Sequence, residues 1–275
     1  MRTIRLVTAT SAAVLCLAAL NACGPDNSGD QNASKTTAPT AAATTPATGT
    51  ATGTPTGAPA TTGGQGKPTG GATAPAGDGI PAKAWMDTKN VPMDATLHWA
   101  PLAANAKPVT GPVTFKAQDL CHAPIGKDDE STFTGQAAGK ALVGFGADHW
   151  MAQQTLLYHG DPTHSSGTKQ LTGLTRTHLT DAVKNCAKTA PGATVKVSSP
   201  DDAPYFAATA TIPQSDGSTV TLHEYVLDAG GTVSELSVFA TTKAGAQPKE
   251  AWTAPEDKYV ATGMTAPACE AFPGC

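Results

Sequence analysis

Ser166 and Lys169 have the spacing Ser-x-x-Lys, in which a lysine one helical turn away accepts the proton of a serine nucleophile. Enzymes that use this pair also need a later Ser-x-Asn or Ser-Asp-Asn motif and a Lys-Thr-Gly motif. The sequence contains neither, and Gly167 favours a loop at this point. We therefore expect no catalytic residues, and a cell-envelope hydrolase using Ser166 and Lys169 is the alternative.

Three histidines, His149, His159 and His164, lie close in sequence to Asp148 and Asp161. Imidazole and carboxylate groups are common metal ligands. Their spacing matches no known ligand set, so we expect solvated loop histidines and no bound metal or other cofactor.

Two pairs of adjacent residues could act as general acid and general base: Asp201 with Asp202, and His223 with Glu224. Neighbouring residues of a strand point to opposite faces of its sheet. His223 and Glu224 therefore should not line one site, and we expect these pairs on the surface.

The chain has six cysteines, of which four would remain after export and lipidation: Cys121, Cys186, Cys269 and Cys275. An even number of cysteines in an exported chain indicates disulfides. We favour the pairs Cys121–Cys186 and Cys269–Cys275, because Pro273 and Gly274 can turn the short loop of the second pair. A zinc site is the competing interpretation, but the sequence lacks the paired Cys-x-x-Cys spacing.

The residues at 20–23, Leu-Asn-Ala-Cys, have the pattern of a bacterial lipoprotein cleavage box. They end an apolar run that follows Arg2 and Arg5 and is shorter than the roughly 20 apolar residues that span a bilayer. We expect residues 1–22 to be removed as a signal peptide and Cys23 to carry a diacylglyceryl membrane anchor. A soluble secreted chain and an uncleaved membrane helix are the alternatives.

Residues 24–79 contain no Val, Ile, Leu, Met, Phe, Trp or Tyr, and Thr, Ala, Gly and Pro dominate. Such a tract cannot bury enough apolar surface to offset the cost of ordering it. We expect residues 23–79 to form a lipidated, disordered linker before a single extracytoplasmic domain over residues 80–275. Its threonines beside prolines also suit O-linked sugar, although a bare spacer is the simpler expectation.

The net charge of the full chain is −4, and the loss of Arg2 and Arg5 with the signal peptide takes it to −6. Lys and Arg are scattered and form no basic cluster, which argues against a nucleic-acid partner. The expected partners are the membrane, through Cys23, and an unidentified small ligand, cell-wall component or protein.

The elements that must position these residues are strands and one long helix. The helix is predicted by an apolar stripe at helical spacing, made of Leu171, Leu174, Leu179, Ala182, Val183 and Cys186. Strands are expected at 113–115, 150–158, 195–197, 205–212, 219–227 and 232–241, and Asp-Gly and Gly-Gly turns join the last three as hairpins. The fold class is therefore α+β, an antiparallel β-sheet meander with one or two helices packed on one face.

The two ends of this domain lack clear periodicity. We expect residues 80–116 to be extended arms that pack on the core through Trp85, Met86, Val91, Met93, Leu97 and Trp99. Residues 243–275 look like an irregular tail, held by Trp252, Tyr259 and Val260. A ligand cleft is expected between the helix and the sheet, lined by Trp150, Tyr158 and Tyr225.

The chain runs from an export signal and a Thr/Pro-rich linker to a Trp-containing arm, Asp119-Leu120-Cys121, a strand, a helix ending in Asn185-Cys186 and a three-strand meander. This order of features resembles the actinobacterial sensor-domain lipoproteins and is similar to the extracellular domain of the PknH-type receptor kinases. The resemblance covers residues 80–242.

This resemblance implies an antiparallel sheet with packed helices, a cleft, disulfides, and a sensing or binding role without catalysis on the outer face of the cell membrane. The sequence departs from those kinases in having no kinase domain or membrane helix, and in adding Cys269 and Cys275. A purely structural surface protein, with neither pocket nor partner, is a further alternative.

Overall fold

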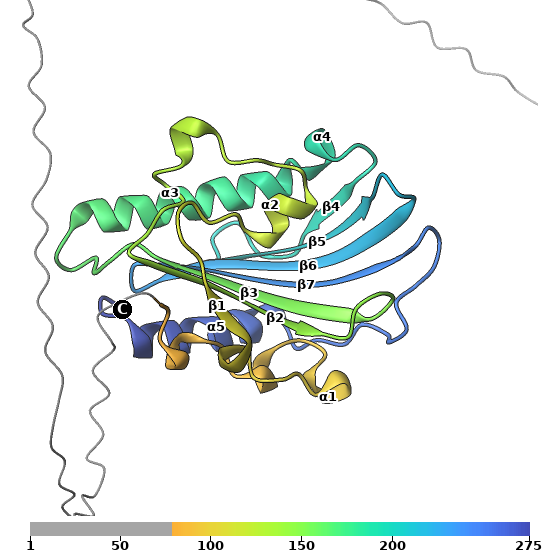
Figure 1. Cartoon of the computed structure of the whole chain (residues 1–275), viewed down its shortest axis with the longest axis horizontal. Coiled ribbons are helices and arrows are strands. Elements are labelled where there is room, and N and C mark those ends of the chain that lie inside the picture. Colours follow the sequence, from red (N-terminus) through yellow and green to blue (C-terminus); the bar gives the residue numbers. More distant parts are fainter. Residues whose placement is uncertain (1–78) are drawn as a thin grey trace, which may run out of the picture. The chain divides into compact units, whose positions relative to one another are not determined.

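The structure, a computed structural model, describes residues 79–275. The expected signal peptide, Cys23 and residues 24–78 of the expected linker lie outside the described residues. The described part is built on an antiparallel sheet with the strand order β1-β2-β3-β7-β6-β5-β4 (Figure 1). The strands are β1 (Ala106–Pro108), β2 (Ala137–Gly144), β3 (Trp150–Tyr158), β4 (Thr194–Val197), β5 (Tyr205–Pro213), β6 (Ser218–Ala229) and β7 (Thr232–Lys243).

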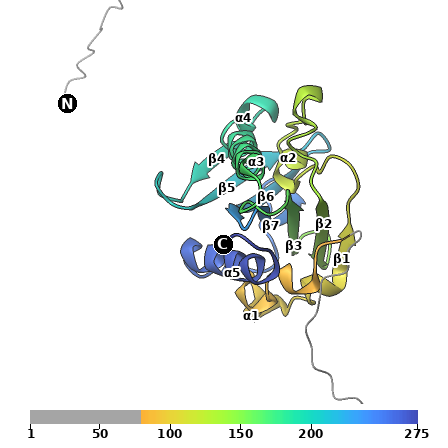
Figure 2. The ribbon, with the colours of Figure 1, turned by 90° about the vertical axis from the view of Figure 1, so that its left-hand side faces the viewer.

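Helices cover both faces of this sheet (Figures 1 and 2). One face carries α2 (Lys116–Leu120), α3 (Ser166–Lys184) and α4 (Cys186–Thr189), and the other carries α1 (Asp94–Leu97) and α5 (Asp257–Ala271). Short 3-10 turns are η1 (Ala82–Ala84), η2 (Thr88–Asn90), η3 (Leu102–Asn105) and η4 (Lys127–Asp129). The α+β class and the antiparallel meander are confirmed. No helix within residues 79–275 combines the length and the apolar character needed to cross a membrane.

The period of two along β6 builds the two apolar layers of the domain. Leu222 and Val226 pack on the face that α3 covers, whereas Tyr225 and Leu227 pack on the face that α5 covers. The sheet is therefore buried on both sides, which explains why β3 shows no clean alternation of apolar and polar residues in the sequence.

The predicted hairpins between β5, β6 and β7 are present. Between β6 and β7, Ala229 pairs with Thr232, so the loop is the two residues Gly230 and Gly231. Both have positive φ, at 55° and 69°. Such a two-residue turn needs this left-handed backbone at both positions, and glycine adopts it without steric cost.

The helix α3 differs from the predicted one in its first half. Leu171 is only half-buried and Leu174 is 41% exposed, so these two residues do not face the sheet as expected. The buried stripe consists of Thr168, Thr172, Thr175, Leu179 and Val183, and continues to Cys186 in α4. The prediction was therefore right for the second half of the helix and wrong for the first.

The polar surface beneath α3 explains this rotation. His159, just after β3, is buried, and its Nε2 lies 3.0 Å from the hydroxyl of Thr175. That hydroxyl also donates to the backbone carbonyl of Thr132 at 2.8 Å. The Thr175 hydroxyl satisfies both of these polar groups, which a leucine at this position could not do.

The expected irregular tail contains the helix α5, so the prediction of an irregular segment was wrong for residues 257–271. Its residues Val260, Met264 and Ala268, spaced by four, are buried against the sheet. Gly263 lets α5 pack closely against η2, because a Cβ at this position would lie only 2.7 Å from the Cβ of Asn90. The helix was not predicted because most of its residues are small and it contains Pro267, so the sequence shows little apolar periodicity.

The N-terminal segment packs as expected but contains no strand at 113–115. All six of its predicted core residues are buried: Trp85, Met86, Val91, Met93, Leu97 and Trp99. Val113 and Phe115 are also buried, but Phe115 is the residue before α2 rather than part of a strand. Its backbone N–H donates to Gln118 Oε1 at 3.0 Å, which favours the start of a helix.

Both favoured disulfides are present. Cys121–Cys186 joins the end of α2 to the start of α4, across 65 residues of sequence. Cys269–Cys275 closes the end of α5 onto the last residue of the sequence. The first bridge therefore fixes the α2 segment beside α3, and the second fixes the C-terminal loop.

Candidate functional site

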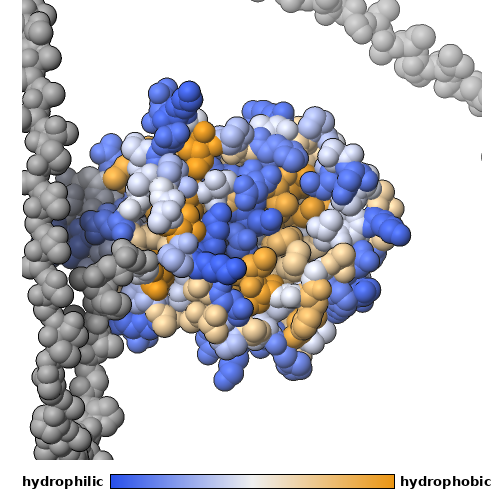
Figure 3. All heavy atoms as spheres, viewed as in Figure 1, coloured by the Kyte–Doolittle hydropathy of each residue, from blue (hydrophilic) through white to orange (hydrophobic). Residues whose placement is uncertain are grey.

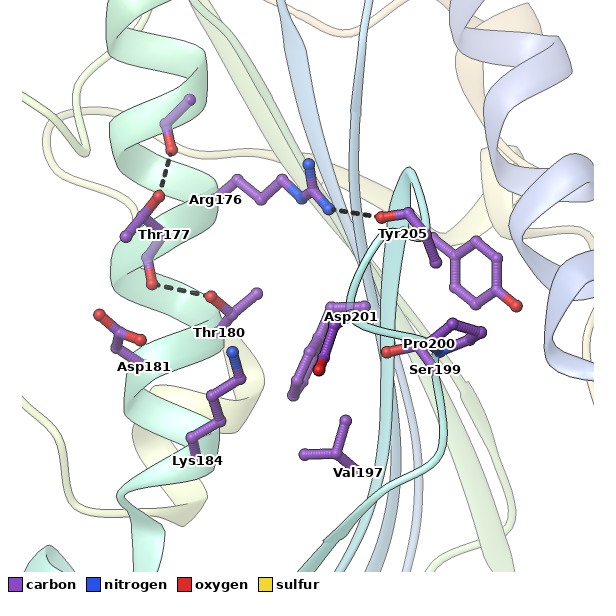
Figure 4. A pocket seen from close by; sticks show the side chains of 13 residues that line it. Arg176, Thr177, Thr180, Asp181, Lys184, Val197, Ser199, Pro200, Asp201 and Tyr205 are labelled. Carbon is purple, nitrogen blue, oxygen red and sulfur yellow. Dashed lines mark hydrogen bonds between the residues drawn. The ribbon is translucent and has the colours of Figure 1, made fainter.

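A cleft of about 420 Å³ lies between α3 and the segment that leads from β4 into β5 (Figure 4). Its helix side is formed by residues spaced by four, Arg176, Thr180 and Lys184. This spacing places all three on one stripe of α3, away from the stripe that packs on the sheet. The opposite wall is formed by residues 197–206.

Arg176 joins the parts of this cleft. Its Nη1 lies 3.2 Å from Asp228 Oδ1 at the end of β6, and its Nη2 donates to the carbonyl of Ala203 at 3.4 Å. A guanidinium carries five N–H donors, so these two contacts leave others free for a ligand. The arginine therefore links α3 to the opposite wall at one end of the cleft and keeps donors for an anionic or carbonyl group.

Lys184 and Asp201 provide charges of opposite sign that no ion pair within residues 79–275 neutralises. The Nζ of Lys184 lies 5.6 Å from the centre of the Phe206 ring, over the floor of the cleft. Asp181 lines the rim, on the side of α3 that points away from the β4–β5 segment (Figure 4). The cleft thus offers both cationic donors and a carboxylate acceptor.

The hydroxyls of the helix wall are already engaged as donors. Thr177 Oγ1 donates to the Gly173 carbonyl at 2.9 Å, and Thr180 Oγ1 donates to the Thr177 carbonyl at 3.0 Å (Figure 4). Their remaining lone pairs can only accept hydrogen bonds. Among residues 79–275, the hydrogen-bond partners of these two hydroxyls are both backbone carbonyls of α3.

The three aromatic residues expected in a cleft lie on the other face of the sheet. Trp150 and Tyr225 are buried in the layer beneath α5, and Tyr158 packs against it. The Trp150 ring lies 4.8 Å from that of Trp252, and the Tyr158 ring stacks on that of Phe272 at 4.2 Å. The structure brings the three to one face, but they form core there and do not line the α3 cleft.

The three histidines do not converge. His149 Nδ1 lies 2.7 Å from Glu250 Oε1, and His164 Nδ1 lies 2.6 Å from Asp161 Oδ2. His159 is buried under α3 instead of being solvated, and burial lowers its pKa to about 4. Within residues 79–275, no three His, Cys, Asp or Glu side chains are grouped as metal ligands.

His223 and Glu224 point to opposite faces, as their place in β6 predicts, but the expectation that they lie on the surface was wrong. His223 stacks on Trp252 with ring centres 3.5 Å apart, and burial lowers its pKa to about 4. Glu224 is fully buried on the α3 face. Asp201 and Asp202 are exposed, as expected.

Ser166 and Lys169 lie in the exposed first turn of α3, where Gly167 is helical rather than in a loop. No hydrogen bond joins the serine to the lysine among the described contacts. Neither residue lines the α3 cleft. The alternative that uses this pair as nucleophile and base therefore gains no support from the geometry.

Sequence reasoning missed Arg176 and Lys184. The signal that could have found them is their spacing by four with Thr180, which places all three on the polar side of the predicted helix. The prediction used only the apolar side of that helix. The sequence matches no protein-family model, and no curated protein or solved structure is significantly similar to it.

Proposed function

We propose that this protein is a non-enzymatic, lipid-anchored extracytoplasmic binding protein, attached through Cys23 and binding a small polar ligand between α3 and the β4–β5 segment. The carrying observation is the α3 cleft, with Arg176, Lys184 and Asp201 on its walls. The export signal and the resemblance to sensor-domain lipoproteins support the same class of protein.

The chemistry of the cleft favours a zwitterionic ligand, such as an amino acid or a short peptide. A carboxylate suits the free donors of Lys184 and Arg176, and an ammonium group suits Asp201. Since α3 rises about 1.5 Å per residue, Arg176 and Lys184 are about 12 Å apart along the helix, so a single carboxylate contacts one of them and the rest of a short peptide extends along the cleft.

The surface favours a small ligand over a large protein partner. Large apolar side chains that are exposed among residues 79–275 are few, and two of them, Leu142 and Phe145, line one pocket; the five are Leu142, Phe145, Leu174, Val197 and Tyr259. On the face shown in Figure 3, hydrophobic residues occur in small groups separated by hydrophilic ones. Protein interfaces are more often marked by larger contiguous apolar patches.

The experiment is a titration of the Cys23→Ser chain with trialanine, followed by amide NMR shifts. We expect the shift changes to concentrate at residues 176–184 and 197–206. The affinity for trialanine should fall at least about tenfold in Lys184→Ala, because one charge-assisted contact is lost. Lys188→Ala, which removes an exposed lysine of α4 outside the cleft, is the matched control.

Shifts confined to other surfaces, or equal affinities in Lys184→Ala and Lys188→Ala, would contradict the assignment of the cleft. Hydrolysis of trialanine during the titration that is lost in Ser166→Ala would favour the envelope-hydrolase alternative.

A further inference from the structure

Two glutamates lie fully buried near the middle of the sheet, on the face that α2 and α3 cover. Glu224 in β6 pairs with Ser237, and Glu235 in β7 pairs with Val226. The two glutamates are thus diagonal neighbours on one face, a separation that long side chains bridge. Two neighbouring carboxyl groups buried in this way cannot both carry a charge without hydration, so the pair shares one proton.

The Glu235 side chain caps the N-terminal end of the helix α2. Its Oε2 accepts the backbone N–H of Lys116 at 2.8 Å, and its Oε1 accepts that of Ala117 at 2.9 Å. These two N–H groups have no acceptor inside the helix, since they belong to its first turn. The carboxylate of Glu235 therefore attaches α2 to the central strand β7.

The shared proton belongs to Glu224. Each oxygen of Glu235 already accepts a backbone N–H, which stabilises its negative charge. Glu224 receives a single donor, the Ser237 hydroxyl at 2.5 Å on Oε2, and its buried Oε1 has no acceptor or donor among the other described groups. Burial and the adjacent Glu235 both raise the pKa of Glu224 well above its ordinary value.

No other charge beneath α2 replaces this proton. From β3 the pair faces the uncharged Gln153 and Thr155, and from α2 it faces Lys116, whose Nζ lies over the Phe239 ring at 4.7 Å. The buried residues of α3 and β5 on this face carry no charge: they include Leu179 and Val183 of α3, the threonines at the start of its buried stripe, and Ala208 and Ala210 of β5. A second negative charge in this site would have to be hydrated.

We propose that α2 is a proton-controlled latch: its N-terminal end stays closed on β7 while Glu224 carries a proton for the pair, and it opens when that proton is lost. The Cys121–Cys186 bridge holds the other end of α2 to α4, so the movement is confined to the side of Lys116 and Ala117. The opening lets water reach Glu224.

The latch has a quantitative signature. Opening returns Glu224 to the ordinary acidity of an exposed glutamate, so it releases one proton at any pH between that value and the raised pKa of the closed state. The opening equilibrium then rises about tenfold for each pH unit in this window, because one proton is exchanged.

The test is hydrogen–deuterium exchange of the Lys116 and Ala117 amides in the Cys23→Ser chain from pH 5 to 9, corrected for intrinsic exchange rates. We expect their protection to fall about tenfold per pH unit at first, and to become independent of pH in Glu224→Gln. Glu256→Gln, which neutralises an exposed glutamate, should keep the slope of the unmodified chain.

A flat profile in the unmodified chain overturns the latch, even if Glu224→Gln does not fold. A slope that persists in Glu224→Gln also overturns it. If the Lys116 and Ala117 amides exchange only as slowly as the amide of buried Leu236, the pair affects global unfolding alone, and the local latch is excluded.

Discussion

The hydroxyl of Thr175 lies 3.0 Å from Nε2 of His159, in the contact between α3 and the end of β3. Because this hydroxyl donates to the carbonyl of Thr132, it accepts from the imidazole, which assigns the ring proton to Nε2. A helix that buries threonines over a neutral histidine is thus held by hydrogen bonds where apolar packing was expected.

We predict that Thr175→Val lowers the free energy of unfolding by about 1–3 kcal/mol, because it leaves buried polar groups of His159 and Thr132 without a partner. Thr177→Val is the matched control, since Thr177 is exposed on the same helix, and it should change stability by less than about 0.5 kcal/mol. Urea unfolding at pH 7 measures both. Equal losses in the two variants would show that the buried hydrogen bond is unimportant.

Two histidines, the buried His159 and the partly buried His223, predict a loss of stability in acid. The folded-state pKa of His159 and of His223 is about 4, against an ordinary 6.5, because burial disfavours the charged form. Between these pH values the unfolded chain binds more protons than the folded one, so the free energy of unfolding falls as pH falls from 6.5 to 4. His159→Gln should flatten this fall, and urea unfolding across the window measures it.

Glu224 has the opposite effect on the pH dependence of stability to that of the two histidines, and it acts at higher pH. Its folded-state pKa is raised, so the folded chain keeps a proton that the unfolded chain has lost, and stability decreases as pH rises above the ordinary glutamate value. Together with the histidines, this predicts maximal stability near pH 6.5. Glu224→Gln should remove the decline on the alkaline side, and an unchanged decline would contradict the assignment of the proton.

In the two-residue turn between β6 and β7, we predict that adding one methyl group at Gly231 strongly lowers the free energy of unfolding. A Cβ at Gly231 would lie 2.0 Å from the carbonyl oxygen of Gly160, and its φ is +69°. Gly231→Ala should therefore cost more than about 2 kcal/mol, as a backbone clash adds to left-handed strain. Gly217→Ala, with φ +81° but open space around it, should cost only the strain, about 1 kcal/mol. Thermal unfolding of the two variants separates these effects.

The two disulfides predict unequal losses on removal. In the chain-entropy model, the bridge across 65 residues is worth about 4 kcal/mol and the bridge across 6 residues about 2 kcal/mol. Cys121→Ser with Cys186→Ser should thus destabilise the chain more than Cys269→Ser with Cys275→Ser. The free energy of unfolding in urea, without reductant, tests the order, and a reversed order would show that packing dominates over loop closure.

Local signals in the sequence predicted the strands β3 to β7, but not β1 or β2. The Gly230-Gly231 turn and the β-rich runs around it specify hairpins through backbone sterics alone, and the tail spacing of Cys269 and Cys275 specifies a short bridge. The first half of α3 could not be predicted, because its inward face is chosen by buried polar groups of His159 and Thr132, which are distant in sequence.

The candidate site was harder to predict than the fold. Trp150 and Tyr225 suggested a cleft because large aromatic residues suit one, but α5 covers them, and that helix gave no periodic signal. The α3 cleft instead lies between the helix and the β4–β5 segment, and its charged lining residues, such as Arg176 and Asp201, were not among the expected ones. Which face of a helix remains open depends on tertiary packing, and composition does not encode it.

The intact mass of the membrane-extracted protein, measured before and after reduction, tests the proposed class of lipid-anchored protein most directly. We predict a chain that begins at Cys23, carries a diacylglyceryl group, and has four hydrogens fewer before reduction, as the two disulfides require. A chain that begins elsewhere, or one that carries no lipid, would contradict the membrane anchor and make the protein a secreted one.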